Sequence, residues 1–235
     1  MTGRINSIQS LGTVDGPGVR AVIFAAGCPL RCMYCHNPDT WHIDDGSLLD
    51  TEELRQKITR LYPYIKDGGV TFSGGEPCMQ AEFFAELAEK LSTDGLHIAL
   101  DTSGCIINEQ VIDLLRFTNL LLLDIKFTSE DDYKRYTGGS LSRTLDFLAI
   151  AEKMNTPVWV RHVVIPGIND TKGDILRLRE IMDGYSCIKK CELLPFKKLC
   201  VPKYESLGIP FPLADTPACE ADRIEYLYGF IEKYR

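Results

Sequence analysis

The chain has 235 residues, of which 45% are hydrophobic and 25% charged, and its formal net charge at pH 7 is −7. Such a chain can bury a substantial core without disulfide bonds, and its length suits one large domain or two small ones. The acidic balance excludes a broad basic face for phosphate backbones, so we expect no nucleic-acid partner.

We expect neither a targeting segment nor a membrane span. Residues 1–7 lack the long apolar core of a signal peptide, and no apolar run approaches the roughly 20 residues that a spanning helix needs. We therefore predict a cytoplasmic protein without a membrane partner. The nine cysteines are an odd number for a disulfide framework, and in a reducing compartment clustered thiols are more often ligands or catalysts.

The predicted elements alternate between strand and helix. Residues 1–18 are polar and end in a Gly16-Pro17-Gly18 turn, since glycine and proline do not suit a helix interior. Strands are predicted over 19–26, 70–73, 97–100, 120–126, 158–165 and 190–194. Helices are predicted from Asp50 to the residues before Gly68 and over 80–92, 108–117, 141–154, 171–182 and 218–234, with a helical turn at 130–136 and an ordered loop at 197–217.

This alternation favours parallel β/α units joined by right-handed crossovers. Six units fall short of a full eight-unit barrel, which typically needs about 250 residues. No Gly-x-Gly-x-x-Gly motif follows the first strand, so a dinucleotide-binding fold has no local support. We therefore predict an α/β fold, a partial (β/α)6 TIM-like barrel that is open on one side and formed by a single domain over residues 1–235.

Polar signatures follow five of the predicted strands. They are the cysteine stretch 28–35, Gly74-Gly75-Glu76, Asp101-Thr102, Asp124 with Lys126, and Phe196-Lys197. In barrels and open α/β sheets the carboxyl ends of the strands carry the active site. Their shared position predicts that these groups converge on one mouth.

Cys28, Cys32 and Cys35 are spaced C-x3-C-x2-C, and four interpretations compete for them. A structural zinc site needs four protein ligands, and His36 is a poor fourth because it adjoins Cys35. The C-x-x-C-H match to a c-type haem attachment leaves Cys28 unexplained. Incidental core cysteines predict no such spacing. An iron–sulfur cubane on three thiolates leaves one iron open for a substrate or cofactor.

The cysteine spacing, with an aromatic residue before the last cysteine, resembles the signature of radical S-adenosylmethionine (SAM) enzymes. Further stretches are similar to one family of glycyl-radical-enzyme activases, the pyruvate formate-lyase-activating enzymes. These stretches are 3–5, 12–20, 34–41, 69–76, 160–167 and 192–195. No cysteine-rich insert follows Trp41, and this favours the formate-lyase type over activases of other glycyl radical enzymes.

The resemblance implies an oxidoreductase that activates formate acetyltransferase (pyruvate formate-lyase) under anaerobic conditions. A [4Fe-4S] cluster would cleave SAM reductively, and the 5′-deoxyadenosyl radical would take a hydrogen from a backbone glycine of the lyase. Flavodoxin or ferredoxin is implied as the electron donor, and we expect a monomer. The alternatives are an activase of a different glycyl radical enzyme and a non-enzymatic zinc-binding module.

The resemblance also assigns site residues. Cys28, Cys32 and Cys35 hold the cluster and, with Lys126, form the catalytic set. The implied SAM pocket comprises the backbone around Tyr34, Cys35 and His36, with Gly75 by the methionine amino group, and Asp124, Ile125, Lys126, Arg161 and Lys197. A monovalent cation, Na⁺ or K⁺, is implied near the cofactor carboxylate, with ligands from Asp101, Thr102, Leu122 and Asp124. Asp15 resembles the region that meets the target's glycine loop.

Two features depart from the family pattern. Lys197 stands where a histidine often follows the Leu-Leu-Pro-aromatic stretch, and an ammonium cannot reproduce the geometry of an imidazole. Cys187, Cys191 and Cys200 form a loose second group, with Cys219 beyond them. Because their spacing matches no ligand motif, we predict free thiols there and no auxiliary cluster.

Overall fold

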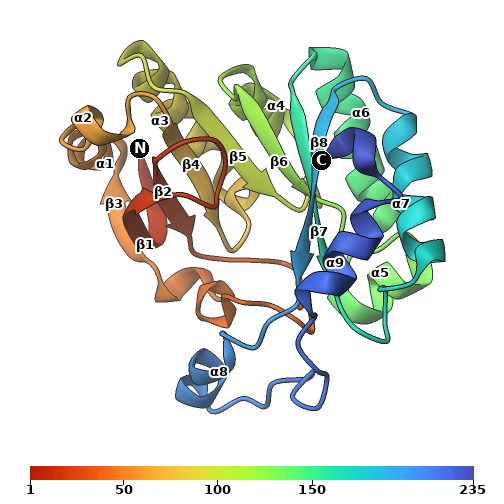
Figure 1. The fold of residues 1–235 in the computed structure, drawn as a ribbon. Helices are drawn as coiled ribbons and strands as arrows, with labels where there is room; N and C mark the ends of the chain where they lie inside the picture. The colour runs from red at the N-terminus through yellow and green to blue at the C-terminus, as the bar shows by residue number, and fades with distance from the viewer.

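The computed structural model describes residues 1–235 and contains one eight-stranded sheet with the order β3-β1-β2-β4-β5-β6-β7-β8. The six strands from β2 to β8 in this order are parallel, and β8 pairs only with β7. The sheet curves without closing, which confirms the open partial barrel (Figure 1). The parallel strands are β2 (Arg20–Ala25), β4 (Gly69–Gly74), β5 (Ile98–Thr102), β6 (Leu120–Asp124), β7 (Val158–Val164) and β8 (Ile188–Pro195).

Two antiparallel strands at one edge were not predicted. β1 (Thr2–Gly12) pairs with β2, and β3 (Ser47–Asp50) pairs with β1. The sequence analysis assigned no strand to residues 1–18, most of which form β1. In β1 only Gly3, Ile5 and Gly12 are buried, so the strand shows no regular alternation that the sequence could reveal. Its pairing with β2 and β3, and not its own composition, makes it a strand.

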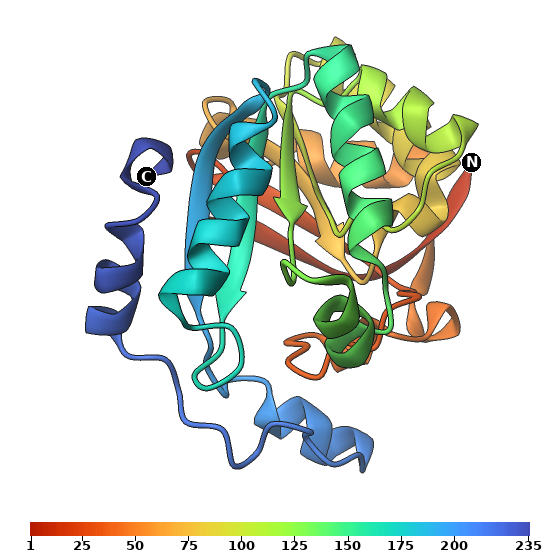
Figure 2. The same cartoon turned by 90° about the vertical axis from the view of Figure 1, so that its right-hand side faces the viewer.

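Helices cover the outer face of the sheet, as Figures 1 and 2 show for α3, α4, α6 and α7. The helices are α1 (Thr51–Thr59), α2 (Tyr62–Ile65), α3 (Ala81–Thr93), α4 (Glu109–Arg116), α5 (Glu130–Thr137), α6 (Leu141–Met154), α7 (Lys172–Asp183), α8 (Val201–Leu207) and α9 (Ala221–Tyr228). Side chains cap the N-termini of several of these helices, and Thr171 with Asp174 forms a full capping box on α7. No helix is both long and apolar enough to span a membrane.

Three helix predictions need correction. The helix expected from Asp50 to before Gly68 is split into α1 and α2, because Pro63 has no N–H to continue the hydrogen-bond ladder of α1. The loop predicted over 197–217 contains α8, which carries a proline in its first turn, where the missing N–H costs nothing. The last helix, predicted over 218–234, is shorter, and a 3₁₀ turn follows it at Glu232–Tyr234.

The core lies between the sheet and its helices and comprises 54 buried residues. A second, much smaller cluster lies on the inner face of the sheet, where Ala99, Leu120 and Leu122 pack with Trp159. Side chains alternate between the two faces, so Leu121 and Leu123 enter the main core while their neighbours point inward. The inner face therefore carries few large apolar side chains, which leaves room for a cavity at the carboxyl ends of the strands.

Candidate functional site

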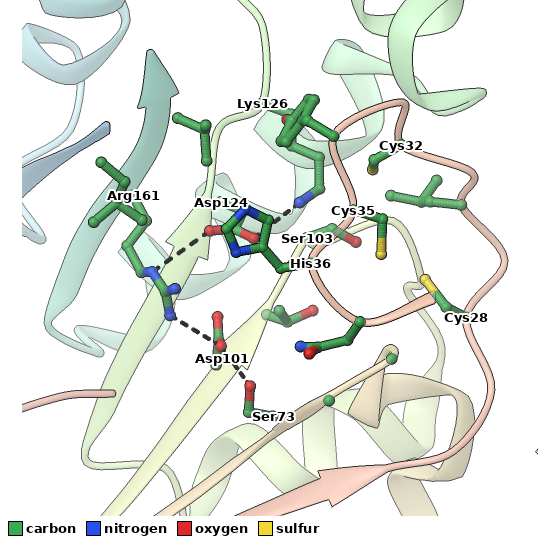
Figure 3. Close-up of a pocket in the computed structure, with 18 of the residues that line it drawn as sticks. Cys28, Cys32, Cys35, His36, Ser73, Asp101, Ser103, Asp124, Lys126 and Arg161 are labelled. Carbon is green, nitrogen blue, oxygen red and sulfur yellow. Dashed lines mark hydrogen bonds and ion pairs between the residues drawn. The ribbon is translucent and has the colours of Figure 1, made fainter. Parts of the chain in front are cut away.

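A cavity of about 250 Å³ lies at the carboxyl edge of the sheet. Every one of the parallel strands contributes to its wall, together with the loop that follows β2 (Figure 3). The strand residues are Phe24, Ser73, Gly74, Asp101, Thr102, Asp124, Arg161, Val163, Leu194 and Pro195. The expected polar signatures thus meet at one mouth, except for Phe196-Lys197, which does not line it.

The loop after β2 carries Cys28, Cys32 and Cys35 along one wall of this cavity, and Arg161 lies on the opposite side (Figure 3). The loop has little regular structure, and distant backbone groups hold it in place. The Gly27 N–H donates to the Thr40 carbonyl at 2.8 Å, and the N–H groups of Arg31 and Met33 donate to carbonyls at the end of α5. The cysteines therefore lie in a pre-formed arrangement.

Burial controls the protonation of the three thiols. It raises the pKa of Cys28 far above the usual range, that of Cys32 to about 11, and that of Cys35 as well. The nearby Lys126 ammonium opposes this shift at Cys32. The thiols are therefore protonated at neutral pH, and ligation to a metal releases their protons. No group of three His, Cys, Asp or Glu side chains is placed to hold a single metal ion.

Residues 197–204 contact the cysteine loop and the residues that follow it. The Tyr204 hydroxyl donates to the Cys35 carbonyl at 3.2 Å, and Lys203 Nζ lies 2.9 Å from Asp39 Oδ1. His36 Nε2 lies 2.9 Å from the carbonyl oxygen of Lys197. The side chain of Lys197 is exposed and its backbone supplies the contact, so the lysine in place of the family histidine does not reach the cavity.

Two acids and two bases form a charged wall. Arg161 Nη1 lies 2.9 Å from Asp101 Oδ2, and Lys126 Nζ lies 2.9 Å from Asp124 Oδ2 (Figure 3). Ser73 Oγ also donates to Asp101 at 2.6 Å. Arg161 Nε also lies 3.8 Å from Asp124 Oδ1, so the guanidinium, which lines the cavity, faces both carboxylates.

Burial and charge shift the two carboxyl pKa values in opposite directions. Burial raises the pKa of Asp101 to about 6, although Arg161 opposes the shift. Burial acts on Asp124 too, but the charges of Lys126 and Arg161 outweigh it and lower the pKa of Asp124 below its usual range. Asp124 is thus held ionised beside two cations, whereas Asp101 titrates closer to neutrality.

Glu76 belongs to the polar signature that follows β4, but its carboxylate is buried and does not line the cavity. It does cap a short 3₁₀ helix through the Cys78 N–H, but it also accepts hydrogen bonds from Thr102 Oγ1 at 2.6 Å and from both the N–H and the hydroxyl of Ser103. Glu76 therefore ties the exits of β4 and β5 together beneath the cavity. Its position after two glycines at a strand end was the only sequence signal.

Gly75 allows the exit of β4 to approach the cysteine loop closely. A Cβ atom at this position would lie 2.2 Å from the Gly27 carbonyl oxygen and 3.0 Å from that of Thr40. The Gly75 and Glu76 N–H groups donate to the carbonyls of Ala25 and Gly27. Only glycine permits this contact, which closes the cavity floor against the cysteine loop.

The remaining predicted residues are divided between the cavity and its surroundings. Asp15, Tyr34 and His36 line the cavity, and the Tyr34 hydroxyl is buried without a hydrogen-bond partner. Leu122 and Ile125 are buried outside the lining, although Leu122 pairs with Asp101 across β5 and β6. Cys187, Cys191, Cys200 and Cys219 are buried and free.

His162 is a further residue that the sequence analysis missed. Its buried ring donates from Nδ1 to the Ile125 carbonyl at 2.6 Å, because a carbonyl can only accept. The Nε2 atom then accepts from Asn169 Nδ2 at 3.2 Å. Burial lowers the pKa of His162, which favours this neutral form. The ring fixes the backbone between Asp124 and Lys126, and no local motif indicated it.

The family model described as the Radical SAM superfamily matches residues 22–178. The chain is 42% identical over 233 residues to the pyruvate formate-lyase-activating enzyme of Clostridium pasteurianum, with 98% of each chain covered. It is 39% identical over 240 residues to the enzyme of that name from Staphylococcus epidermidis, covering 98% of this chain and 96% of the relative.

Among solved structures, a domain of pyruvate-formate lyase-activating enzyme from Bacteroides vulgatus superimposes with a TM-score of 0.59 at 20% identity. The match covers 71% of this chain and 94% of that domain. At this identity the likeness concerns the fold alone, and it agrees with the open sheet described above.

Proposed function

From the premise that this chain belongs to the radical SAM superfamily, and within it to the family of pyruvate formate-lyase-activating enzymes, we propose that it installs a glycyl radical in formate acetyltransferase (pyruvate formate-lyase). The observation that carries the proposal is the identity of 42% over 98% of both chains. The cavity adds a physical argument, because it combines three cysteines with the cationic side chains of Lys126 and Arg161.

The residues fit the cofactors of the family. Three thiols on one loop would provide the ligands for a cluster with one open iron, and the cationic side chains of Lys126 and Arg161 line the same cavity. When bound, the reduced [4Fe-4S] cluster supplies the electron that cleaves SAM, and SAM supplies the radical that removes the glycine hydrogen. The protein's own contribution is to orient these groups and to exclude water, so it needs no general acid or base.

We also propose a monovalent cation, Na⁺ or K⁺, bound by Asp101, Thr102, Asp124 and the carbonyl of Leu122. Three of these residues line one cavity, and the fourth pairs with Asp101 in the sheet. Hard oxygen ligands suit such a cation. Activity in buffers in which choline replaces all Na⁺ and K⁺ tests this proposal. Equal activation rates with and without the metal cations would refute it.

The contact with the target is proposed to include Asp15. In support, Asp15 belongs to the connection between β1 and β2 but lines the same cavity as the cysteines. Cytoplasmic flavodoxin or ferredoxin as the electron donor, and a monomeric enzyme, rest on the family resemblance.

The decisive experiment is anaerobic activation. The reconstituted protein is incubated with the lyase, SAM and a chemical reductant, and the glycyl radical is followed by electron paramagnetic resonance. We expect a glycyl signal, about four irons and four sulfides per chain, and no signal from a Cys35→Ser variant. A signal only with another glycyl radical enzyme would reassign the target. One zinc per chain without iron would refute the enzymatic proposal.

A further inference from the structure

Arg20, the first residue of β2, is fully buried, with an exposed fraction of 0%. No carboxylate lies within ion-pair distance of its guanidinium, although a buried arginine is normally paired with an acid. Burial lowers the pKa of Arg20 to about 10, and the more distant Asp15 charge opposes this shift. Because burying a charge without an ion pair is energetically unfavourable, other contacts must stabilise the Arg20 guanidinium.

Neutral oxygens replace the missing carboxylate. The guanidinium donates from Nε to Thr71 Oγ1 at 2.7 Å and from Nη2 to the Val70 carbonyl at 2.7 Å. The Nη1 atom donates to the carbonyls of Pro17, at 3.1 Å, and Gly68. The planar fork of donors therefore joins the start of β4 to the turn that precedes β2.

The turn over residues 15–18 packs directly against this guanidinium. Gly16 has a φ of +118°, and a Cβ atom there would lie 3.2 Å from Arg20 Cδ and Nε. Gly18 has a φ of +74°, and a Cβ atom there would lie 2.9 Å from the Cα atom of Gly68. Side chains other than glycine would be strained at both positions, so Gly16 permits the close approach to Arg20 and Gly18 the close approach to Gly68.

Thr71 extends the contact to Asp15. Its hydroxyl accepts from Arg20 Nε and donates to the Asp15 carbonyl at 2.6 Å. The carboxylate of Asp15 accepts no hydrogen bond from the chain, and it lines the cavity that contains the cysteines. The neighbouring residue Val14 is 75% exposed, so its packing contributes little to fixing the position of Asp15.

We infer that Arg20 is a positioning residue that holds the Asp15 carboxylate in the cavity. Arg20 does so through Thr71 and the carbonyls of residues 15 and 17. In this position the Asp15 carboxylate binds backbone N–H groups of the target's glycine-containing segment. This inference rests on the proposed function for the identity of the target. A carboxylate without internal partners is a suitable acceptor for such N–H groups. Arg20 itself touches neither cofactor nor target.

The chain offers matched variants for a test. Thr71→Val removes the hydroxyl at nearly constant shape, while Thr71→Ser keeps it. Arg20→Lys retains the charge but replaces the donor fork by one ammonium group. Thr118→Val is the control, because Thr118 Oγ1 also donates from a buried site to a backbone carbonyl, that of Leu114, but lies outside the cavity lining.

The first readout is hydrogen–deuterium exchange of the cofactor-free proteins. We expect faster exchange at residues 12–19 in Thr71→Val and Arg20→Lys than in the wild type, Thr71→Ser and Thr118→Val. This result depends on neither the cofactors nor the target. Unchanged exchange at these residues in both Thr71→Val and Arg20→Lys would overturn the inference.

The second readout separates binding from turnover in the activation assay with the intact lyase. Loss of the hydrogen bond to the Asp15 carbonyl should raise the KM for the lyase roughly 3- to 10-fold in Thr71→Val, with kcat changed less than twofold. Thr71→Ser should restore the wild-type KM. An equal loss of thermal stability in Thr71→Val and Thr118→Val with identical KM values would show a merely structural role. If the wild type itself installs no radical, the proposed function is refuted. The hydrogen–deuterium exchange at residues 12–19 still tests the role of Arg20 in that case.

Discussion

Replacing Glu76 by glutamine would turn one acceptor oxygen into a donor at a site where every partner donates. Glu76 is 1% exposed, and its oxygens accept from the N–H groups of Cys78 and Ser103 and from the hydroxyls of Thr102 and Ser103. The hydroxyls can rotate to accept from the new amide. The backbone N–H groups cannot, so either orientation of the amide leaves one of them facing a donor.

The expected cost follows from this geometry. A buried unpaired donor costs about 1–3 kcal/mol, and the remaining hydrogen bonds lose the strength that a charged acceptor gave them. We therefore expect Glu76→Gln to lower the free energy of unfolding by roughly 2–4 kcal/mol. Urea denaturation of the cofactor-free protein under anaerobic conditions measures it directly.

A matched control is Glu130→Gln. Glu130 is exposed, and its Oε2 accepts from the Ser142 N–H at 3.0 Å. This change should alter the free energy of unfolding by less than about 0.5 kcal/mol. Equal stabilities of Glu76→Gln and the wild type would refute the hydrogen-bond network described beneath the cavity.

Three further changes test separate parts of the site. In Gly75→Ala the new Cβ would lie 2.2 Å from the Gly27 carbonyl oxygen, so the cysteine loop must move. We therefore expect the reconstituted variant to hold less than half of the iron that the wild type holds. The control Gly173→Ala, whose Cβ would have no neighbour closer than 3.6 Å, should retain all of the iron. Tyr204→Phe removes the hydrogen bond to the Cys35 carbonyl and should accelerate iron loss to a chelator several-fold. Tyr226→Phe, at an exposed site, should not accelerate iron loss. Equal rates in the two variants would show that the Tyr204 hydrogen bond does not stabilise the cysteine loop. Burial lowers the pKa of His162 below 6.5, so the unfolded chain binds the proton more tightly and the stabilisation is complete only above that value. The difference in free energy of unfolding between the wild type and His162→Asn should therefore shrink as the pH falls from 7 to 5, by up to about 1.4 kcal/mol per pH unit, and a constant difference would contradict the neutral ring.

The local pattern of the chain was enough to predict the parallel part of the fold. Buried strands such as β6, with its run of leucines, alternate with amphipathic helices, and each pattern depends on residues within a few positions of one another. The cysteine spacing is local in the same sense, because one loop supplies all three ligands. The edge strands β1 and β3 escaped prediction, since only their partners across the sheet make them strands.

The sequence by itself determined the alternation of strands and helices, the cysteine loop after β2 and the family resemblance. The tertiary structure alone decided which distant groups meet. Arg161 reaches Asp101, Tyr204 reaches Cys35, and Arg20 binds groups at 68–71 and His97. The register and curvature of the sheet set these contacts, and their partners lie dozens of residues apart in the chain. Local periodicity carries no information about such pairs, so the charged wall and the support of the Asp15 turn became visible only in the folded protein.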